Sequence, residues 1–389
     1  MPSGSQGSVT LTPVRTLTRA SGAGLAVMAT GFVLPNTLSA TSGHLVDEGL
    51  VGPGLLGAAA ALAFATAAIT SAATGRWVYQ HGGLRAATWC GSWSLVAVVL
   101  VVLAPHGSLV LASAVAGGVA FAIAIPLVMQ TVGAASGAQG RHQGVAQAGS
   151  QLGGLLVAAS VAVGAVVGSW RLGVVTAAVA IAMSSVALRS GFASPAPRRP
   201  RVTVPAPDGL RLLTFVLNGT VVTVLTLGPT YAVELGAVPP SGASSITGLL
   251  VAATLVAKLV WGRVTDGPGS AGALRSMSLL AAAAVAALAI ATVGGVVWLW
   301  VGIGLFGLTA GAWLVPVLAG VAGAPNAAQL AAGLMVWAYI GAASVPLVAG
   351  LIWEMVGAAP VWAILAVGLC TVPRVAGALV TGSADANRS

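Results

Sequence analysis

Twelve long apolar runs follow one another along this chain of 389 residues, and each has the length of a helix that crosses a bilayer. The hydrocarbon core of a membrane is roughly 30 Å thick, which corresponds to about 20 residues of α-helix. The runs do not alternate in polarity, as the strands of a membrane barrel do. They lie near residues 22–45, 53–75, 86–104, 108–131, 144–167, 171–190, 211–233, 242–263, 273–294, 297–320, 328–350 and 358–378. The sequence therefore predicts an all-α integral membrane protein with twelve transmembrane helices.

The near absence of charge excludes a soluble fold. Charged residues make up 6% of the chain, whereas a soluble domain contains about 25%. The 53 glycines show no Gly-X-Y period, so a collagen-like fibre is also excluded. A net charge of +9 would suggest a nucleic-acid ligand in a soluble protein, but in a membrane protein the excess is expected on the cytoplasmic side. We therefore expect a lipid bilayer around the chain and no nucleic-acid partner.

The distribution of charge predicts the orientation in the membrane. When the N-terminus is placed inside, all of the 16 lysines and arginines except Arg171 fall on the cytoplasmic side. The acids Asp47, Glu48, Glu234 and Glu354 fall instead at external helix ends. We expect a multi-pass protein of the cytoplasmic (inner) membrane with both termini in the cytoplasm.

A polar segment near the middle of the chain divides the runs into two sets of six. Residues 191–210 are rich in proline and arginine and form the longest polar break after the N-terminal segment. The predicted parts are a cytoplasmic tail over 1–21, a six-helix bundle over 22–190, this cytoplasmic linker, a second six-helix bundle over 211–378 and a cytoplasmic tail over 379–389.

Glycines recur at the offset expected for an internal repeat. Gly75 closes the second run and Gly262 closes the eighth, at an offset of 262 − 75 = 187. At the same offset Gly154 in the fifth run corresponds to Gly341 in the eleventh. The two bundles are therefore predicted to be pseudo-symmetric.

A loop motif after the eighth run is similar to one of a known family. Residues 262–266, Gly-Arg-Val-Thr-Asp, resemble the start of the motif Gly-x-Leu-x-Asp-Arg-x-Gly-Arg-Arg. The major facilitator superfamily places this motif after its second and eighth helices. Together with the helix number, the halves and the linker, the resemblance covers the whole chain. It implies a secondary transporter that works by alternating access, and not an enzyme.

The first-half copy of the motif, residues 75–85, is less complete. It begins with Gly75 and Arg76 and keeps both glycines, Gly75 and Gly82, and a late basic residue, Arg85. Tyr79 stands where the family has aspartate and Gln80 where it has arginine. By the pseudo-symmetry, the first-half loop would lie against the eleventh helix. Any latch between the halves is therefore expected to be weaker there, or to use a hydroxyl group.

Asp266 in the second copy is a candidate gating residue, together with Gly262 and Arg263. A carboxylate is stabilised near the positive N-terminal end of a helix. We expect Asp266 to face the start of the fifth helix near Arg141 and so to connect the two halves in one state of the cycle. The alternative is that Asp266 is a solvated loop acid beside Arg263.

Several motifs that would indicate catalysis or a cofactor are missing from the sequence. The phosphate loop of an ATP-driven pump needs Gly-Lys-Ser/Thr, but the only lysine, Lys258, is followed by Leu259. Residues 302–307 match Gly-x-Gly-x-x-Gly but lie inside an apolar run, where helix packing explains them. The four histidines are scattered along the chain. We expect no enzymatic activity, no cofactor and no metal.

The substrate path of such a transporter is expected near the membrane midplane, between the halves. The predicted lining residues are polar or aromatic side chains about halfway along their helices: Asn36, Gln147, Gln151, Asn218, Thr223, Trp313, Trp337 and Tyr339. Amide, indole and phenol groups suit a small, neutral or weakly polar organic solute. Hydrogen bonding between helices is the alternative role for each of these side chains. We expect a monomer that exports such a solute.

Lys258 allows a second interpretation of the path. Because it stands one turn before Gly262, its stem is expected to reach the cytoplasmic face by snorkelling. The alternative is an anion contact, with Lys258 and the Gln147/Gln151 face serving uptake or exchange of a small anion. A third possibility is a membrane sensor or scaffold without transport.

No acid stands in the middle of an apolar run, and this limits the means of coupling to protons. The possible coupling acids are Asp47, Glu48 and Glu234, all at external ends. The fourth run carries no charge and the fifth contains no proline, unlike the family's proton-driven drug exporters. Drug/proton antiport is therefore disfavoured.

Overall fold

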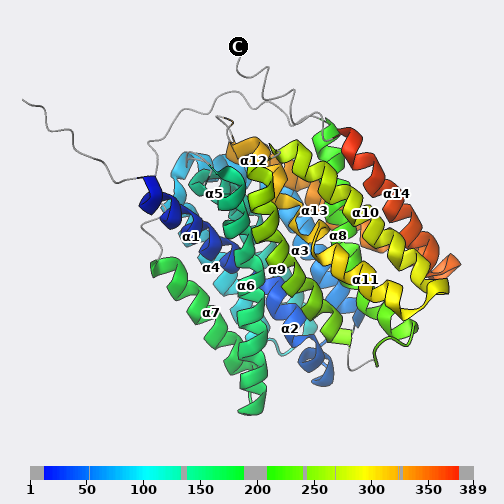
Figure 1. Cartoon of the computed structure of the whole chain (residues 1–389). Coiled ribbons are helices and arrows are strands. Elements are labelled where there is room, and N and C mark those ends of the chain that lie inside the picture. The colour runs from blue at the N-terminus through cyan, green and yellow to red at the C-terminus, as the bar shows by residue number, and fades with distance from the viewer. Residues whose placement is uncertain are drawn as a thin grey trace, which may run out of the picture.

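The computed structural model describes residues 13–51, 53–132, 138–187, 208–239, 243–267, 269–322, 324 and 327–375, and the regular structure within them is helical. The first half contains α1 (Pro13–Gly31), α2 (Val33–Asp47), α3 (Pro53–His81), α4 (Gly83–Val102), α5 (Gly107–Val132), α6 (Gln139–Val166) and α7 (Trp170–Ala187). The second half contains α8 (Asp208–Glu234), α9 (Ala243–Asp266), α10 (Gly269–Gly294), α11 (Val296–Gly307), the short 3₁₀ helix η3 (Ala310–Ala312), α12 (Leu314–Ala322), α13 (Ala327–Val356) and α14 (Ala358–Val375). In Figure 1, α1 and α7 lie to the left, α10 and α14 lie to the right, and α6 and α9 run side by side in the centre.

These helices form the predicted number of membrane spans. Within the described residues, nine helical segments are long and apolar enough to cross a membrane, with α11, η3 and α12 together counting as one. A tenth span consists of α1 and α2, which are bent by 46°. The shorter apolar helices α7 and α14 bring the number to 9 + 1 + 2 = 12. The prediction of an all-α membrane protein with twelve spans is confirmed.

Proline explains why two of the spans are broken. Pro35 has no N–H group and its ring crowds the carbonyl of residue 31, which is where α1 ends. Pro316 in α12 acts in the same way on residue 312, the last residue of η3. Gly31 and Val33 at the first break and Ala310 and Ala312 at the second are buried, as backbone that leaves a membrane helix must be.

The first and seventh spans begin earlier than predicted. α1 begins at Pro13, inside the predicted 1–21 tail, because proline is well suited to the first helical position. α8 begins at Asp208, inside the predicted 191–210 linker, and its carboxylate lies 3.0 Å from Arg211. An acid in the first turn stabilises a helix start. The predicted tail 379–389 and linker residues 191–207 lie outside the described residues.

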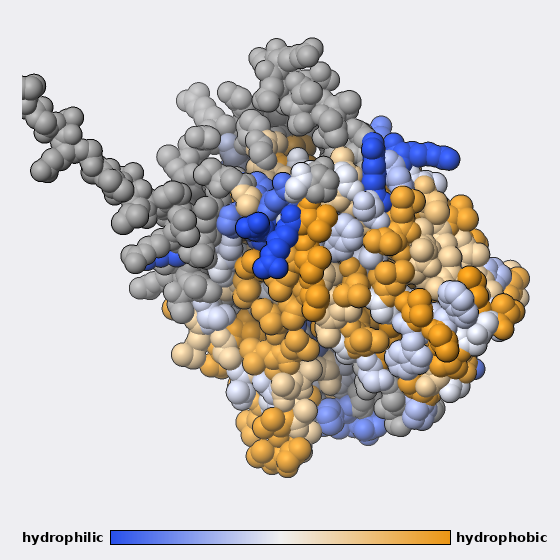
Figure 2. Space-filling view, viewed as in Figure 1, coloured by the Kyte–Doolittle hydropathy of each residue, from blue (hydrophilic) through white to orange (hydrophobic). Residues whose placement is uncertain are grey.

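The two ends of the bundle differ in charge. The basic end, where α3, α5, α9 and α12 finish, carries Arg76, Arg85, Arg141, Arg263 and Arg275. The acidic end, where α2, α6, α8 and α13 finish, carries Asp47, Glu48, Glu234 and Glu354. Figure 2 shows orange, apolar residues across the middle of one face and blue, hydrophilic residues toward its upper edge. That the basic end is cytoplasmic remains a prediction.

Close helix contacts confirm the internal repeat. A Cβ atom on Gly75 of α3 would lie 2.4 Å from the Cβ atom of Ala332 on α13. A Cβ atom on Gly262 of α9 would lie 2.8 Å from the carbonyl oxygen of Gly140 on α6. Each glycine therefore lies where a helix of its half crosses one of the other half. The offset of 187 residues relates equivalent positions of two pseudo-symmetric bundles.

Candidate functional site

The halves meet most closely at the basic end, where α6 crosses α9. A Cβ atom on Gly144 would lie 2.5 Å from the carbonyl oxygen of Lys258, and one on Gly262 would lie 3.2 Å from the Cα atom of Gly144. Because these contacts involve backbone, no side chain fits between the helices. Glycine allows this approach, and it leaves the basic end closed along the crossing.

Asp266 connects the halves at the same crossing. The backbone N–H groups of Gly140 and Arg141 donate to its carboxylate oxygens over 2.7 and 3.2 Å. The Arg141 Nε atom lies 3.6 Å from the carboxylate. Asp266 therefore binds the N-terminus of α6, where unpaired N–H groups favour an anion. The predicted position of Asp266 near Arg141 is confirmed, and the alternative of a solvated acid beside Arg263 is wrong.

The equivalent crossing of α3 and α13 closes without a carboxylate. Gly75 packs on Ala332 there. Among the described residues, the Tyr79 hydroxyl has no hydrogen-bond partner. The halves are therefore held at this crossing by close packing of small residues, as expected from the loss of the family's aspartate.

Aromatic side chains close the space between the halves nearer the midplane. The Tyr339 hydroxyl of α13 donates to the carbonyl oxygen of Phe121 on α5 over 3.3 Å. Phe64 of α3 lies between them, with ring centroids 6.2 Å from Tyr339 and 6.0 Å from Phe121. Tyr339 is 2% exposed, so it forms part of a barrier and not of an open surface.

A cleft lies on the other side of this barrier, toward the acidic end. It consists of a cavity of about 540 Å³ between α2, α6 and α9 and one of about 220 Å³ between α2, α3 and α5. Both cavities include Ser39 and Ser42 in their lining, so they adjoin. The polar side chains that line the larger cavity are Asn36, Ser39, Ser42, His44 and Thr247. No carboxylate is present in the lining that these residues and their apolar neighbours form.

Asn36 was predicted from the sequence as a lining residue, but the hydroxyl groups that accompany it were not. Asn36, Ser39 and Ser42 recur every three residues, a spacing that places them along one side of a helix. This three-residue spacing is the sequence signal that could have predicted the two serines as lining residues. His44, near the end of α2, also lines the larger cavity.

Lys258 of α9 lies between the cleft and the basic end, and its side chain faces α6 of the other half. The residue is only 5% exposed. Its ammonium group donates to the carbonyl oxygen of Gln147 and to the Ser150 hydroxyl over 2.9 Å each, and to Gln151 Oε1 over 2.5 Å. These three acceptors match the three donors of an ammonium group. Asn36 links them to the cleft, because its Nδ2 atom donates to the carbonyl oxygen of Ser150 over 3.0 Å.

The predicted snorkelling of Lys258 is therefore wrong. Toward the basic end, Gly262 packs directly on α6 and leaves no room for the lysine stem. The acceptors on α6 take up the charge instead. The predicted Gln147/Gln151 face does meet Lys258, and both amide atoms of the fully buried Gln147 side chain lack a hydrogen-bond partner within the described structure.

Four other predicted path residues do not line the cleft. The Asn218 amide donates to the carbonyl oxygen of Ala338 over 2.8 Å, and the Thr223 hydroxyl donates to that of Gly219 over 2.8 Å. Trp313 is 3% exposed and belongs to the apolar core. Trp337 is 39% exposed on the outer stripe of α13, so its placement in the path is wrong.

A separate cluster connects α2 to α7 at the acidic end. Glu48 accepts hydrogen bonds from Arg171, over 2.9 Å to Nη1, and from the indole nitrogen of Trp170 over 2.6 Å. His44 stacks on Trp170 with ring centroids 5.9 Å apart. Hydrogen bonds from Arg171 and then Trp170 hold the pKa of the Glu48 carboxyl below its usual value. Glu48 is thus a paired structural acid, and neither Asp47 nor Glu234 lines the cleft.

This pairing predicts a pH-dependent contribution to stability. Because the pKa of Glu48 is lowered by folding, its stabilisation is present above the ordinary value of 4.5 and is lost as the pH falls through the folded-state value. We expect Glu48→Gln to lower the Tm at pH 7, and the difference from the wild type to vanish in acid. Thermal unfolding in detergent between pH 7 and 3 measures this, with Asp47→Asn as the control. An equal Tm difference at both extremes would contradict the assignment.

Comparisons with known proteins show the fold. No family model and no curated protein sequence matches this chain. Among solved structures, the human organic anion transporter MFSD10 (TETRAN) is similar with a TM-score of 0.75 and 15% identity, covering 94% of this chain and 99% of that one. The E. coli fucose:proton symporter FucP is similar with a TM-score of 0.72 and 11% identity, covering 94% and 98%.

A third solved structure is similar to this chain over most of its length. The major facilitator superfamily proton:xylose symporter XylE has a TM-score of 0.72 and 14% identity, covering 92% of this chain and 94% of that one. These values agree with the twelve spans and the two pseudo-symmetric halves. The chain is a multi-pass membrane protein with the fold of the major facilitator superfamily.

Proposed function

We propose that this protein is a secondary transporter that moves a small, neutral or weakly polar organic solute by alternating access. The observation that carries the proposal is the cleft, whose walls come from α2 and α6 of one half and α9 of the other. Hydroxyl, amide and apolar groups line it, so it offers hydrogen bonds without a fixed carboxylate. A solute that touches both halves at once is able to link its binding to their relative movement.

The closed basic end and the cleft toward the acidic end define one state of such a cycle. With the predicted orientation, in a cytoplasmic membrane with the basic end inside, this is an outward-facing state. To reach the opposite state, α6 and α9 must separate at the basic end. Separation breaks the hydrogen bonds of Asp266 and of Lys258, and a new contact near the cleft must replace them. We propose export as the direction because the path is apolar and poor in acids.

Gly248 offers a test of the cleft as the binding site. It lines the larger cavity from α9, and a Cβ atom there would meet no other atom within 4 Å. Gly248→Leu therefore fills the cleft without disturbing the helices. We expect solute counterflow in proteoliposomes to fall about tenfold or more, because a pocket that must accept extra methylene groups loses affinity on this scale.

The matched control is Gly304→Leu on α11, where a Cβ atom also meets nothing within 4 Å and no part of the cleft is formed. It is expected to keep the counterflow of the wild type. The screen uses a panel of neutral solutes and small organic anions. If no member of the panel exchanges in the wild type, the protein is a sensor or scaffold and the proposal fails.

A second candidate function is uptake or exchange of a small anion. The buried Lys258 ammonium has no carboxylate partner among the described residues. It donates to the backbone carbonyl of Gln147, and the side-chain amide of the same residue is buried without a partner. A buried cation without a counter-ion favours a negatively charged ligand. The similar human structure is described as an organic anion transporter. Counterflow of anions, but not of neutral solutes, would select this function.

A further inference from the structure

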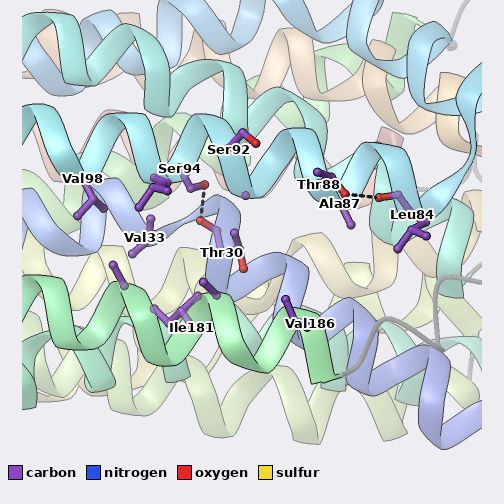
Figure 3. A pocket seen from close by; sticks show the side chains of 14 residues that line it. Thr30, Val33, Leu84, Ala87, Thr88, Ser92, Ser94, Val98, Ile181 and Val186 are labelled. Carbon is purple, nitrogen blue, oxygen red and sulfur yellow. Dashed lines mark hydrogen bonds between the residues drawn. The ribbon is translucent and has the colours of Figure 1, made fainter.

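A groove on the outer face of the first half lies between α4 and α7, with the α1/α2 break as its floor. Its volume is about 470 Å³. Figure 3 shows Thr88 and Ser94 of α4 on one side and Ile181 and Val186 of α7 on the other, with Thr30 between them. The groove belongs to one half alone, so it is separate from the cleft between the halves.

The surface of the groove is apolar although several hydroxyl groups line it. The Thr88 hydroxyl donates to the carbonyl oxygen of Leu84 over 3.0 Å, and that of Ser94 donates to the carbonyl oxygen of Thr30 over 2.8 Å. The bonds to backbone leave methyl and methylene groups as the accessible surface of Thr88 and Ser94, whereas the exposed hydroxyl of Ser92 has no such bond in the described structure. Leu84 and Val186 at the rim are 50% and 63% exposed, so the groove opens toward the surrounding lipid.

The equivalent place in the second half is more tightly filled. There α10 and α14 pack extensively against each other. Trp362 and Leu369 of α14 are fully buried in that contact region. On α7 the corresponding surface carries Ala178 and Ala182, whose small side chains leave space that larger ones would fill.

Arg85 stands at the end of the groove that lies at the basic end. It is exposed, follows the lining residue Leu84 and has no ion-pair partner among the described residues. From Leu84 to Val98 the lining follows α4 for about 21 Å at 1.5 Å per residue. One leaflet of the hydrocarbon core is about 15 Å thick, so the groove is long enough to hold one acyl chain over the full depth of a leaflet.

We propose that this groove is a binding site for one phospholipid with an anionic headgroup. One acyl chain lies along α4 and α7, and the phosphate group is at the Arg85 guanidinium in the leaflet of the basic end. The shape of the groove gives the chain its contacts, and the charge of Arg85 gives the preference for an anionic lipid. This site does not depend on the proposed transport function.

Native mass spectrometry of the full chain in mild detergent tests the proposal. The protein is titrated with phosphatidylglycerol and, separately, with phosphatidylcholine of the same acyl chains. We expect one tight binding event, with phosphatidylglycerol favoured about fivefold, the effect of one basic residue near a membrane surface. Arg85→Gln is expected to remove this preference without abolishing binding.

Gly91→Leu tests the groove itself. Gly91 lines it, and a Cβ atom there would meet no other atom within 4 Å, so the leucine side chain enters the groove without a clash. We expect the affinity for phosphatidylglycerol to fall about tenfold, the effect of displacing about two buried methylene groups. Gly304→Leu is the control for an added leucine elsewhere, and it is expected to bind as the wild type does.

Three outcomes would overturn the proposal. The first is equal lipid binding by Gly91→Leu and the wild type. The second is binding of phosphatidylcholine and phosphatidylglycerol with equal affinity in the wild type. The third is a dimer that Gly91→Leu dissociates, since the groove would then hold a second copy of the chain. A Tm of Gly91→Leu close to that of the wild type confirms that the variant is folded.

Discussion

Replacing Gly262 with leucine is expected to reduce solute counterflow by about 100-fold and to leave the basic end open. The Cβ atom alone would lie 2.8 Å from the Gly140 carbonyl oxygen and 3.2 Å from the Gly144 Cα atom. Because both contacts are with backbone, α6 and α9 must move apart. The two N–H groups that bind Asp266 are then lost to it, at about 1.5–3 kcal/mol for each hydrogen bond to a charged group.

The measurement combines counterflow with alkylation of a cysteine at Thr265. This residue is 4% exposed at the crossing, so a cysteine there reacts only when the basic end opens. Cys90 and Cys370 are first replaced by serine. The series Gly262→Ala and Gly262→Leu is expected to show increasing alkylation. Gly350→Leu, where a Cβ atom meets nothing within 4 Å, is the control. Normal counterflow in Gly262→Leu would show that this crossing does not have to close.

Replacing Lys258 with methionine is expected to open the same crossing and to reveal the charge of the solute. Methionine has a similar length but no donor, so the acceptors on Gln147, Ser150 and Gln151 each lose a charge-assisted hydrogen bond. We expect alkylation at Thr265→Cys to increase by at least one to two orders of magnitude, which is the effect of losing a single bond of about 1.5–3 kcal/mol.

The same variant separates the two candidate functions. If Lys258 only connects the halves, a neutral solute still binds to Lys258→Met, and a thermal-shift titration shows an affinity close to that of the wild type. If Lys258 binds an anion, that affinity falls about 100-fold, as for a lost charged partner. Arg263→Met is the control, because it removes a cation of α9 that has no hydrogen-bond partner in the described structure. Unchanged alkylation in Lys258→Met would refute the connecting role.

The sequence predicted the spans, the repeat and the Asp266 contact because each depends on a strong local signal. Apolar length defines a membrane span whatever its neighbours are. The repeat then places Asp266 at a helix start in the other half by symmetry alone. Proline accounts for the breaks at Pro35 and Pro316 but did not make them predictable, because Pro126, Pro229 and Pro346 stand inside helices that continue.

The direction of individual side chains was not predictable in this manner. Trp337 and Tyr339 are two residues apart, yet one is on the outer surface and the other connects the halves. In a membrane both faces of a helix are apolar, so hydropathy does not reveal which one meets protein. Lys258 was misjudged because its acceptors are on α6, more than a hundred residues earlier. Only the fold shows that they are close.

Alternating access is tested most directly by measuring the two ends of the path together. Single cysteines at Thr247, in the cleft, and at Thr265, in the closed crossing, are alkylated with and without a solute that exchanges in proteoliposomes. We predict that the solute lowers the rate at Thr247→Cys and raises it at Thr265→Cys, and that Gly248→Leu abolishes both changes. Rates that rise or fall together at the two positions, or that do not respond to any transported solute, would contradict the account.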